Sequence, residues 1–262
     1  MSTDEQGTSF RFQEVPGSIP IVLVHGVGLD QTIWNRMLRD LTSYSTLTYD
    51  LLGHGDTILP LGAQSFEPFV GQLYSLLDAI GISEFVLVGF SLGGQVAKHF
   101  ASMYPNRIKG LVLISTTYQR TTVERGNMAS RVFQAKHGDQ PSLETAALQR
   151  WFNPEFLVAN PDIATYIIAR LRNNDPVRFI ESYELLSKAE DHSVEYSALT
   201  MPAIILTGDG DEGSTPFMAM EMARAMPNAR AVIIQGAKHI GIIELHHQFS
   251  DALISFVSET VI

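Results

Sequence analysis

A serine inside a Gly-x-Ser-x-Gly pattern is the residue in this sequence best suited to act as a nucleophile. Ser91 lies between Gly89 and Gly93, after the apolar run Phe85–Val88 and before a helix-compatible stretch, Gln95–Met103. A strand that turns abruptly into a helix leaves the middle residue on a strained corner, with its side chain clear of the backbone. We therefore predict that Ser91 is a catalytic nucleophile; the alternative is an ordinary turn rich in glycine and serine.

A serine hydroxyl attacks well only when a base removes its proton, and that base and its acid partner follow such a corner in the chain. His239 is the best candidate for the base because it lies in a loop just after the apolar run Ala231–Ile234. Five other histidines follow Ser91: His99, His137, His192, His246 and His247. The adjacent pair His246 and His247 would point in different directions, so we interpret it as a helix surface rather than a metal site.

The acid that orients the base should also follow a strand. The segment after the apolar run Ala203–Leu206 contains three candidates, Asp209, Asp211 and Glu212. We favour Asp211 because it lies deeper in the loop, before a Ser-Thr-Pro sequence typical of a helix start. Asp209 is interpreted as a residue that accepts hydrogen bonds from loop amides.

An oxyanion that develops on an attacked carbonyl needs two backbone N–H donors. We predict the N–H groups of Leu92, at the start of the helix after Ser91, and of Val27, in the loop His25–Gly28. His25 precedes the nucleophile, and we expect it to bond the loop backbone.

Strand and helix patterns alternate along most of the chain, which predicts an α/β fold with a mostly parallel sheet covered by helices on both faces. Expected strands are Ile19–Val24, Leu47–Tyr49, Phe85–Val88, Leu111–Ile114, Pro202–Leu206 and Ala231–Ile234, with a short edge strand at Phe10–Phe12. Expected helices of this core are 31–41, Phe66–Ile80, Gln95–Met103, Thr215–Met226 and Ile242–Val257. Met218, Met222 and Met226 recur at helical spacing and are interpreted as core.

The alternation stops between residues 117 and 199, where only helical patterns occur. Expected helices are Val123–Lys136, Leu143–Trp151, Asp162–Leu171 and Val177–Leu186. We predict a core of residues 1–116 and 200–262 with a helical lid, 117–199, inserted in it. Within the lid, Trp151 and Phe152 are candidates to line a substrate pocket, although a role in the lid core fits them equally well.

Composition excludes several classes of function. The 262 residues are 45% hydrophobic and 18% charged, and contain no cysteine, so neither disulfides nor a thiol nucleophile is available. The net charge of −10 argues against nucleic acid and against anionic membrane surfaces as partners. No signal peptide or membrane-spanning run is visible, and we expect a soluble, cytoplasmic protein.

Five motifs in order identify the chain as similar to the α/β-hydrolase superfamily. They are His25–Gly28, Asp50-x-x-Gly53-His54-Gly55, Gly89–Gly94, Gly208-x-x-Asp211 and Gly236-x-x-His239. In this resemblance Asp50 and His54 form a structural turn. The serine motif resembles those of small carboxylesterases and cofactor-free haloperoxidases, and the stretch Arg150–Phe156 resembles 3-oxoadipate enol-lactonases. The N-terminal region looks shorter than the superfamily's opening strands, which leaves the first sheet edge undefined.

We therefore predict a serine hydrolase that cleaves small carboxylic esters through an acyl-enzyme, without a metal or organic cofactor. A lactonase of the enol-lactone type is the alternative, and carbon–carbon bond hydrolysis, perhydrolysis and a receptor without turnover are minor ones. Residues 117–199 carry seven arginines and two lysines against eleven acids, a net charge of −2, so no strong anion trap is expected. Arg120 or Arg150 could still act locally.

Overall fold

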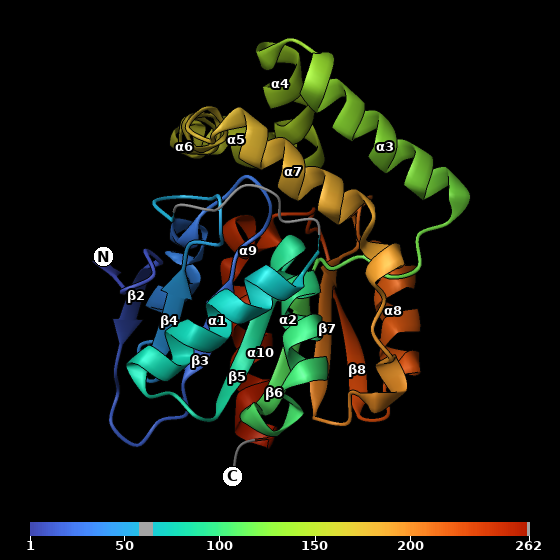
Figure 1. Cartoon of the computed structure of the whole chain (residues 1–262). Helices are drawn as coiled ribbons and strands as arrows, with labels where there is room; N and C mark the ends of the chain where they lie inside the picture. Colours follow the sequence, from blue (N-terminus) through green and yellow to red (C-terminus); the bar gives the residue numbers. More distant parts are fainter. Residues whose placement is uncertain (58–64, 261–262) are drawn as a thin grey trace.

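One mixed sheet forms the centre of the protein. In the computed structural model, which describes residues 1–57 and 65–260, eight strands pair in the order β1-β2-β4-β3-β5-β6-β7-β8 (Figure 1). β1 and β2 are antiparallel to their neighbours and the other pairs are parallel. The strands are β1 (Ser2–Thr3), β2 (Ser9–Gln13), β3 (Ile21–Val24), β4 (Thr46–Tyr49), β5 (Phe85–Phe90), β6 (Ile108–Ile114), β7 (Ala203–Gly208) and β8 (Ala229–Ile234). Residues 58–64 and 261–262, which fall in the predicted core ranges, lie outside the described residues.

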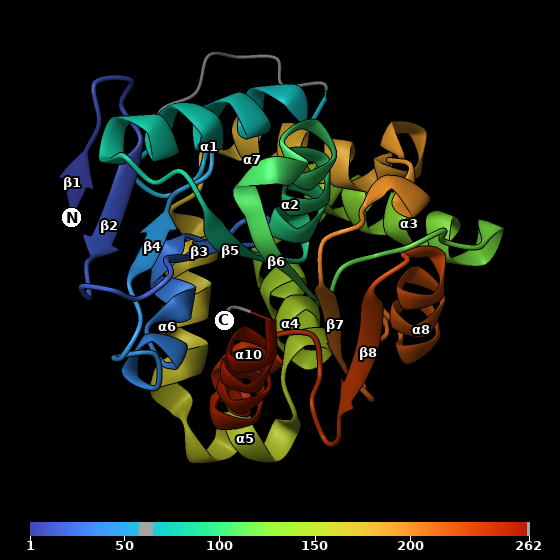
Figure 2. The ribbon, with the colours of Figure 1, turned by 90° about the horizontal axis from the view of Figure 1, so that it is seen from below.

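Helices cover both faces of the sheet, because the central strands β3, β5 and β7 are buried at every position. In β3, Val22 and Val24 face one buried cluster, and Ile21 and Leu23 face the other. On the first face lie α1 (Glu67–Ile80), α2 (Leu92–Met103) and α8 (Pro216–Ala225); on the second lie α9 (Gly241–Glu244) and α10 (His246–Thr260). Figure 2 shows α1 and α10 on opposite sides of the strands. The predicted α/β fold is confirmed.

Five helices lie between β6 and β7 in the chain and cover the carboxyl edge of the parallel strands (Figure 1). They are α3 (Thr122–His137), α4 (Gln140–Trp151), α5 (Pro154–Ala159), α6 (Pro161–Arg172) and α7 (Pro176–Ser187). Short helical turns follow at Ala189–His192 and Tyr196–Ala198. Residues 117–199 are called the helical insertion below. Four of its helices match the predicted ones within a few residues, and α5 was not predicted.

Two predicted core helices differ from the observed ones. The segment predicted as one helix over 31–41 forms two 3₁₀ turns, Gln31–Trp34 and Met37–Arg39. The Asp30 side chain accepts the Thr32 N–H at the start of the first turn, which buries the apolar side chains without a continuous helix. The helix predicted over Ile242–Val257 is broken at Leu245 into α9 and α10.

Smaller differences concern the start of β3 and the edge of the sheet. β3 starts at Ile21 rather than Ile19, because Pro20 has no N–H to donate to a neighbouring strand. The strand predicted at Phe10–Phe12 exists as β2, but β1 pairs with it, so β2 is not the edge. Within the described residues, no helix is both long and apolar enough to cross a membrane.

Candidate active site

Ser91 occupies the corner between β5 and α2. β5 ends at Phe90 and α2 begins at Leu92, and Ser91 between them has φ 53° and ψ −111°. A positive φ in a residue with a side chain costs about 1–3 kcal/mol, and such strain persists only where the surroundings enforce it. Here the Ser91 N–H donates to the carbonyl of Ile114 on the neighbouring strand at 2.9 Å. The sharp corner predicted from the Gly-x-Ser-x-Gly pattern is therefore present.

The glycines around Ser91 allow the corner to pack closely. A Cβ atom added to Gly93 would meet the backbone carbonyls of Val24 and His25, at the end of β3. A Cβ atom on Gly89 would meet the backbone of Gly93 and Gly94. The spacing of the motif thus lets α2 start directly against the central strands.

Three side chains from three separate loops meet at this corner. His239 Nε2 lies 3.3 Å from Ser91 Oγ, and His239 Nδ1 lies 2.8 Å from Asp211 Oδ2. With its proton on Nδ1, His239 donates to the Asp211 carboxylate and leaves Nε2 free to accept the proton of Ser91. The arrangement has the hydrogen-bond order that a nucleophile, its base and an orienting acid require.

Asp211 is held as a carboxylate by its surroundings. Its side chain is fully buried, and Oδ1 accepts the N–H groups of Gly213 and Ser214, both at 2.9 Å. Burial alone would raise the pKa of this carboxyl, but His239 and the two amides together hold the pKa below its usual range. Asp209, in contrast, accepts the N–H of Gly236 at 2.8 Å, and Glu212 is exposed.

The loop that carries Val27 is fixed from two sides. Within it, His25 Nδ1 donates to the carbonyl of Gly26, and His25 Nε2 accepts the Leu51 N–H at 2.9 Å. Burial lowers the pKa of His25 to about 4. The ring is therefore neutral and structural at pH 7, in the role expected for it.

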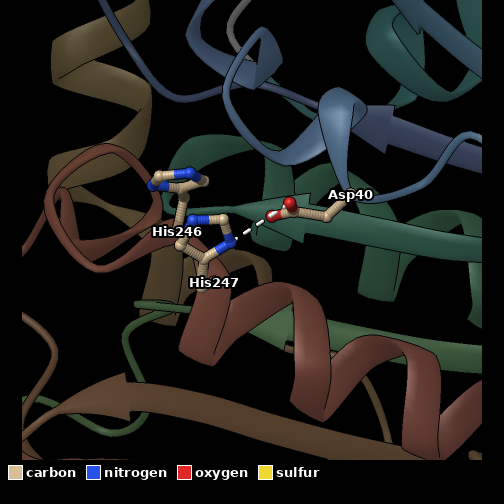
Figure 3. Close-up of side chains that lie close together, drawn as sticks. All are labelled: Asp40, His246 and His247. Atoms are coloured by element: carbon tan, nitrogen blue, oxygen red, sulfur yellow. Dashed lines mark ion pairs between the residues drawn. The ribbon is translucent and has the colours of Figure 1, made fainter.

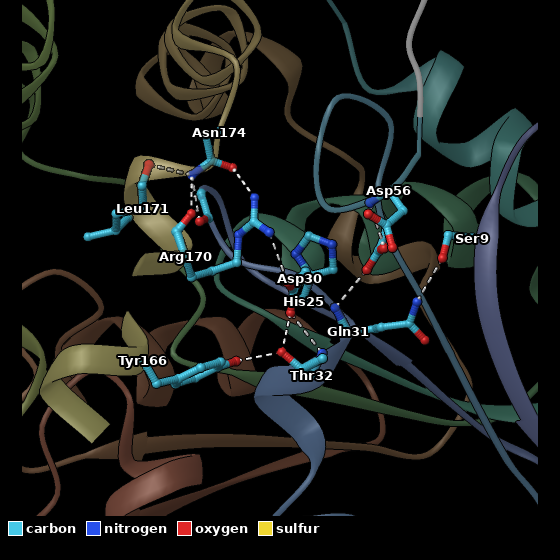
Figure 4. Close-up of polar contacts among 12 residues, drawn as sticks. Ser9, His25, Asp30, Gln31, Thr32, Asp56, Tyr166, Arg170, Leu171 and Asn174 are labelled. Atoms are coloured by element: carbon cyan, nitrogen blue, oxygen red, sulfur yellow. Dashed lines mark hydrogen bonds and ion pairs between the residues drawn. The ribbon is translucent and has the colours of Figure 1, made fainter. Parts of the chain in front are cut away.

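The helical insertion holds the same loop from the other side (Figure 4). Asn174 Nδ2 donates to the carbonyl of Gly28 at 2.8 Å, and Arg170 pairs with Asp30 at 3.2 Å. The hydroxyl of Tyr166 lies 2.6 Å from Thr32 Oγ1. These insertion residues were not identified from the sequence, because no local pattern shows that α6 contacts the loop after β3.

The two N–H groups predicted to bind an oxyanion have no hydrogen-bond partner among the described residues. Leu92 is the first residue of α2, where the helix leaves its N–H groups unpaired. Val27 lines the same cavity as Ser91. Among the described residues both N–H groups are thus unpaired, and Val27 lies at the cavity wall.

The turn with Asp50 and His54 serves the backbone. Asp50 accepts the N–H groups of Gln31 at 2.9 Å and of Asp56 at 3.0 Å. His54 Nδ1 donates to the carbonyl of Leu52 at 3.0 Å, and burial lowers the pKa of His54 to about 3. Neither residue lines the cavity described next.

A cavity of about 450 Å³ opens above Ser91 and His239, between the sheet edge and the helical insertion. Of the two predicted pocket residues, Trp151 lines it. Phe152 does not: it is fully buried and stacks on Phe156, with ring centroids 5.6 Å apart. Consecutive residues at the end of α4 point to different sides, so Phe152 packs in the core while Trp151 faces the cavity.

The end of α4 also holds the loop of His239. The Ile240 N–H donates to the carbonyl of Trp151 at 3.2 Å, and Asn153 Nδ2 donates to the carbonyl of Gly236 at 2.7 Å. The sequence pattern gave no signal for the Asn153 contact, since it joins segments more than 80 residues apart. The helical insertion thus positions both the His239 loop and the Val27 loop.

A second cluster of polar groups, drawn in Figure 3, contains no residue of the cavity lining. Asp40, His246 and His247 each contribute one possible metal-ligand atom, and these three atoms lie within 4.8 Å of one another. His247 Nδ1 is 3.1 Å from Asp40 Oδ1. The two histidine rings are 4.0 Å apart between centroids. The expectation that adjacent histidines would point apart is wrong here, because the pair lies at the first turn of α10, where the chain bends at Leu245. His247 is nevertheless exposed, as expected for a helix surface.

Comparisons with known proteins support a hydrolase. A curated relative from Acinetobacter baylyi, named (E)-2-((N-methylformamido)methylene)succinate hydrolase, is 23% identical over 257 residues, 97% of this chain and 95% of that one. A second, from Bacillus subtilis, is named a putative 2-succinyl-6-hydroxy-2,4-cyclohexadiene-1-carboxylate synthase; it is 26% identical and covers 91% of this chain and 90% of its own.

Among solved structures, the enol-lactonase from Burkholderia xenovorans LB400 superposes with a TM-score of 0.86 at 25% identity, covering 96% of both chains. The family model described as the alpha/beta hydrolase fold matches residues 19–244, a range that includes Ser91, Asp211 and His239. The protein belongs to the α/β-hydrolase family.

Proposed function

We propose that the protein hydrolyses small carboxylic esters through an acyl-enzyme on Ser91. The observation that carries the proposal is the hydrogen-bonded row from Ser91 Oγ through His239 to Asp211, of which Ser91 and His239 line the cavity. The 3.3 Å between Ser91 Oγ and His239 Nε2 is at the long end for a hydrogen bond, as is common before a substrate binds.

In the first step, His239 Nε2 takes the proton of Ser91 as Oγ attacks the carbonyl carbon. The Asp211 carboxylate stabilises the imidazolium that forms and keeps the proton on Nδ1. His239 then gives its Nε2 proton to the leaving alkoxide, and an acyl-enzyme remains. Water, deprotonated by His239, attacks the acyl carbon and releases the carboxylic acid and the Ser91 hydroxyl.

The oxyanion formed in each step would be bound by the N–H groups of Val27 and Leu92. Both are unpaired among the described residues, and Leu92 lies at the positive end of the α2 dipole. Loss of one such donor in a hydrolase costs about 10²–10³ in kcat. The contacts from the helical insertion to the Val27 loop would keep this donor in place.

A lactonase is the second candidate, because a lactone is a cyclic ester that the same steps open. The enol-lactonase from Burkholderia xenovorans LB400 matches this chain over almost its full length, at 25% identity. The relative from Bacillus subtilis carries the name of a synthase, so the fold by itself does not decide between hydrolysis and other chemistry.

The Ser91→Ala variant tests the proposal. Wild-type protein should turn over a short-chain 4-nitrophenyl ester, and Ser91→Ala should lower kcat by several orders of magnitude with an unchanged melting temperature. A fluorophosphonate should label Ser91, as identified by peptide mass spectrometry. Ester hydrolysis that survives in Ser91→Ala contradicts the mechanism, and labelling without steady turnover favours the receptor. A lactone hydrolysed with a kcat/KM well above that of every open-chain ester favours the lactonase.

A further inference from the structure

The cavity above Ser91 is lined by more cationic than anionic side chains. Four arginines and one glutamate contribute to its wall: Arg120, Arg131, Arg150, Arg172 and Glu144. All five belong to the helical insertion, whose overall net charge is −2. The acidic residues of this segment therefore lie mostly outside the cavity wall, so the segment's total charge does not describe the site.

Two of the four arginines are neutralised by carboxylates. Arg172 forms two parallel hydrogen bonds to Glu144, at 2.7 and 2.8 Å. Arg120 is buried and pairs with Glu190 at 2.8 Å, and it also donates to the carbonyl of Leu186 at 2.6 Å. These two arginines already have their partners within the protein.

Arg131 and Arg150 lack a carboxylate partner among the described residues. Arg131 Nε is buried without a hydrogen bond among the described residues, and Nη2 donates to the sulfur of Met128 at 3.5 Å. The Arg150 guanidinium lies 5.6 Å from the ring centroid of Trp151, which also lines the cavity. Its nitrogen atoms have no hydrogen-bond partner in the described part of the chain.

The two unpaired guanidinium groups also interact electrostatically with each other. Burial lowers the pKa of Arg150; Tyr183, Asp211 and Glu212 raise it, and the neighbouring charge of Arg131 lowers it. Two like charges that line one half-buried cavity repel each other, and the attraction of both to a bound anion offsets this repulsion. A guanidinium presents a planar pair of N–H groups that matches the two oxygens of a carboxylate.

We propose that the substrate of this protein carries a carboxylate group, which binds to Arg131 and Arg150 in the cavity while its ester or lactone carbonyl lies at Ser91. The inference rests on the proposed ester hydrolysis and specifies its substrate class. Arg131 on α3 and Arg150 on α4 act as specificity-determining residues, and the helical insertion in Figure 1 carries both of them.

The experiment compares esters of equal chain length that differ in one charge. 4-Nitrophenyl hydrogen glutarate is compared with 4-nitrophenyl pentanoate, which places the carboxylate on the acyl side. Phenyl acetate is compared with 4-carboxyphenyl acetate, which places it on the alcohol side. Wild-type protein should prefer the carboxylated member of one pair by at least tenfold in kcat/KM.

Arg131→Gln and Arg150→Gln should each reduce this preference by about 10- to 100-fold, because a hydrogen bond to a charged group is worth that much. The loss should appear mainly in KM for the carboxylated ester, and it should exceed any change in kcat/KM for the neutral ester of the same pair. Arg125→Gln is the matched control: it removes the same charge from an exposed position of α3 that does not line the cavity.

Failure of this inference is distinct from failure of the proposed function. If wild-type protein hydrolyses the neutral ester of both pairs equally well or better, or if Arg125→Gln reduces the preference as much, the carboxylate site is refuted while the hydrolase stands. If no ester is turned over, the hydrolase is refuted, and calorimetry with glutarate tests the site alone. Saturable binding that both cavity variants lose then supports the site, and absence of binding to wild type overturns it.

Discussion

The Asp211→Asn variant tests the direction of every hydrogen bond around His239. Asp211 Oδ1 accepts two backbone N–H groups at 2.9 Å, and Oδ2 accepts His239 Nδ1–H at 2.8 Å. In asparagine the carbonyl oxygen must stay on the two amides, since an NH₂ group there would face two donors. The NH₂ group then faces His239 Nδ1, which has to accept. The proton of His239 moves to Nε2, where it blocks removal of the Ser91 proton.

The expected loss of kcat is large, because His239 stays in place but carries its proton on Nε2 and cannot accept the proton of Ser91. In a serine hydrolase with this arrangement, the corresponding change lowers kcat by about 10⁴, or about 5.4 kcal/mol at 1.36 kcal/mol per factor of ten. The effect on folding is smaller, because the buried site keeps its shape and loses one charge-assisted hydrogen bond, about 1–3 kcal/mol. Catalysis and stability are thus separable in this variant.

The assay is steady-state hydrolysis of a short-chain 4-nitrophenyl ester, with the melting temperature measured in parallel. Asp209→Asn is the matched control, because Asp209 lies in the same loop but accepts only the N–H of Gly236 among the described residues. It should keep kcat within a few-fold. An Asp211→Asn protein that retains kcat within tenfold of wild type would refute the role assigned to Asp211, and an equal loss in Asp209→Asn would attribute the effect to the loop.

Other predictions concern stability. His25 and His54 are buried with pKa values lowered to about 4 and about 3, so between pH 7 and 5 only the unfolded chain takes up their protons. The free energy of unfolding, from urea titrations, should fall by about 2 kcal/mol per histidine at pH 5, and His54→Asn should remove half of that loss. Gly93→Ala should destabilise the fold by about 2 kcal/mol or more, since its Cβ meets backbone at Val24. Gly71→Ala, in α1 with open space around its Cβ, should instead stabilise it by about 0.5–1 kcal/mol in thermal melts, and the reverse order would contradict the packing argument.

The corner at Ser91 could be predicted because its determinants are local. An apolar strand, two glycines at fixed spacing and a helix start are all contained in residues 85–103. The loops of His239 and Asp211 were found for a related reason, since each directly follows a buried strand and the carboxyl ends of parallel strands meet at one edge. Sheet order and the partners of the helical insertion depend on contacts between distant residues, which no local pattern encodes.

The structural predictions were wrong where the spacing of apolar residues is compatible with more than one structure. The apolar residues at Ile33, Trp34 and Met37 fit a helix, yet two 3₁₀ turns bury the same side chains, and Asp30 caps the first of them. Phe152 does not line the cavity, because it packs in the core while its neighbour Trp151 faces the cavity. In both cases the sequence specifies burial, and tertiary packing selects the geometry.

The cavity shows that the net charge of a segment does not give the charge at a site within that segment. The sum over residues 117–199 is slightly negative, which argued against an anionic substrate. The sign at the cavity depends instead on which pairs form: Glu144 and Glu190 each neutralise one arginine, and Arg131 and Arg150 are left facing the cavity. The opposite charges of an ion pair nearly cancel at distances larger than the separation of the two groups. An unpaired guanidinium in a half-buried cavity instead attracts an anionic ligand there. The substrate's charge should therefore follow the unpaired groups of the wall and not the net charge of the insertion.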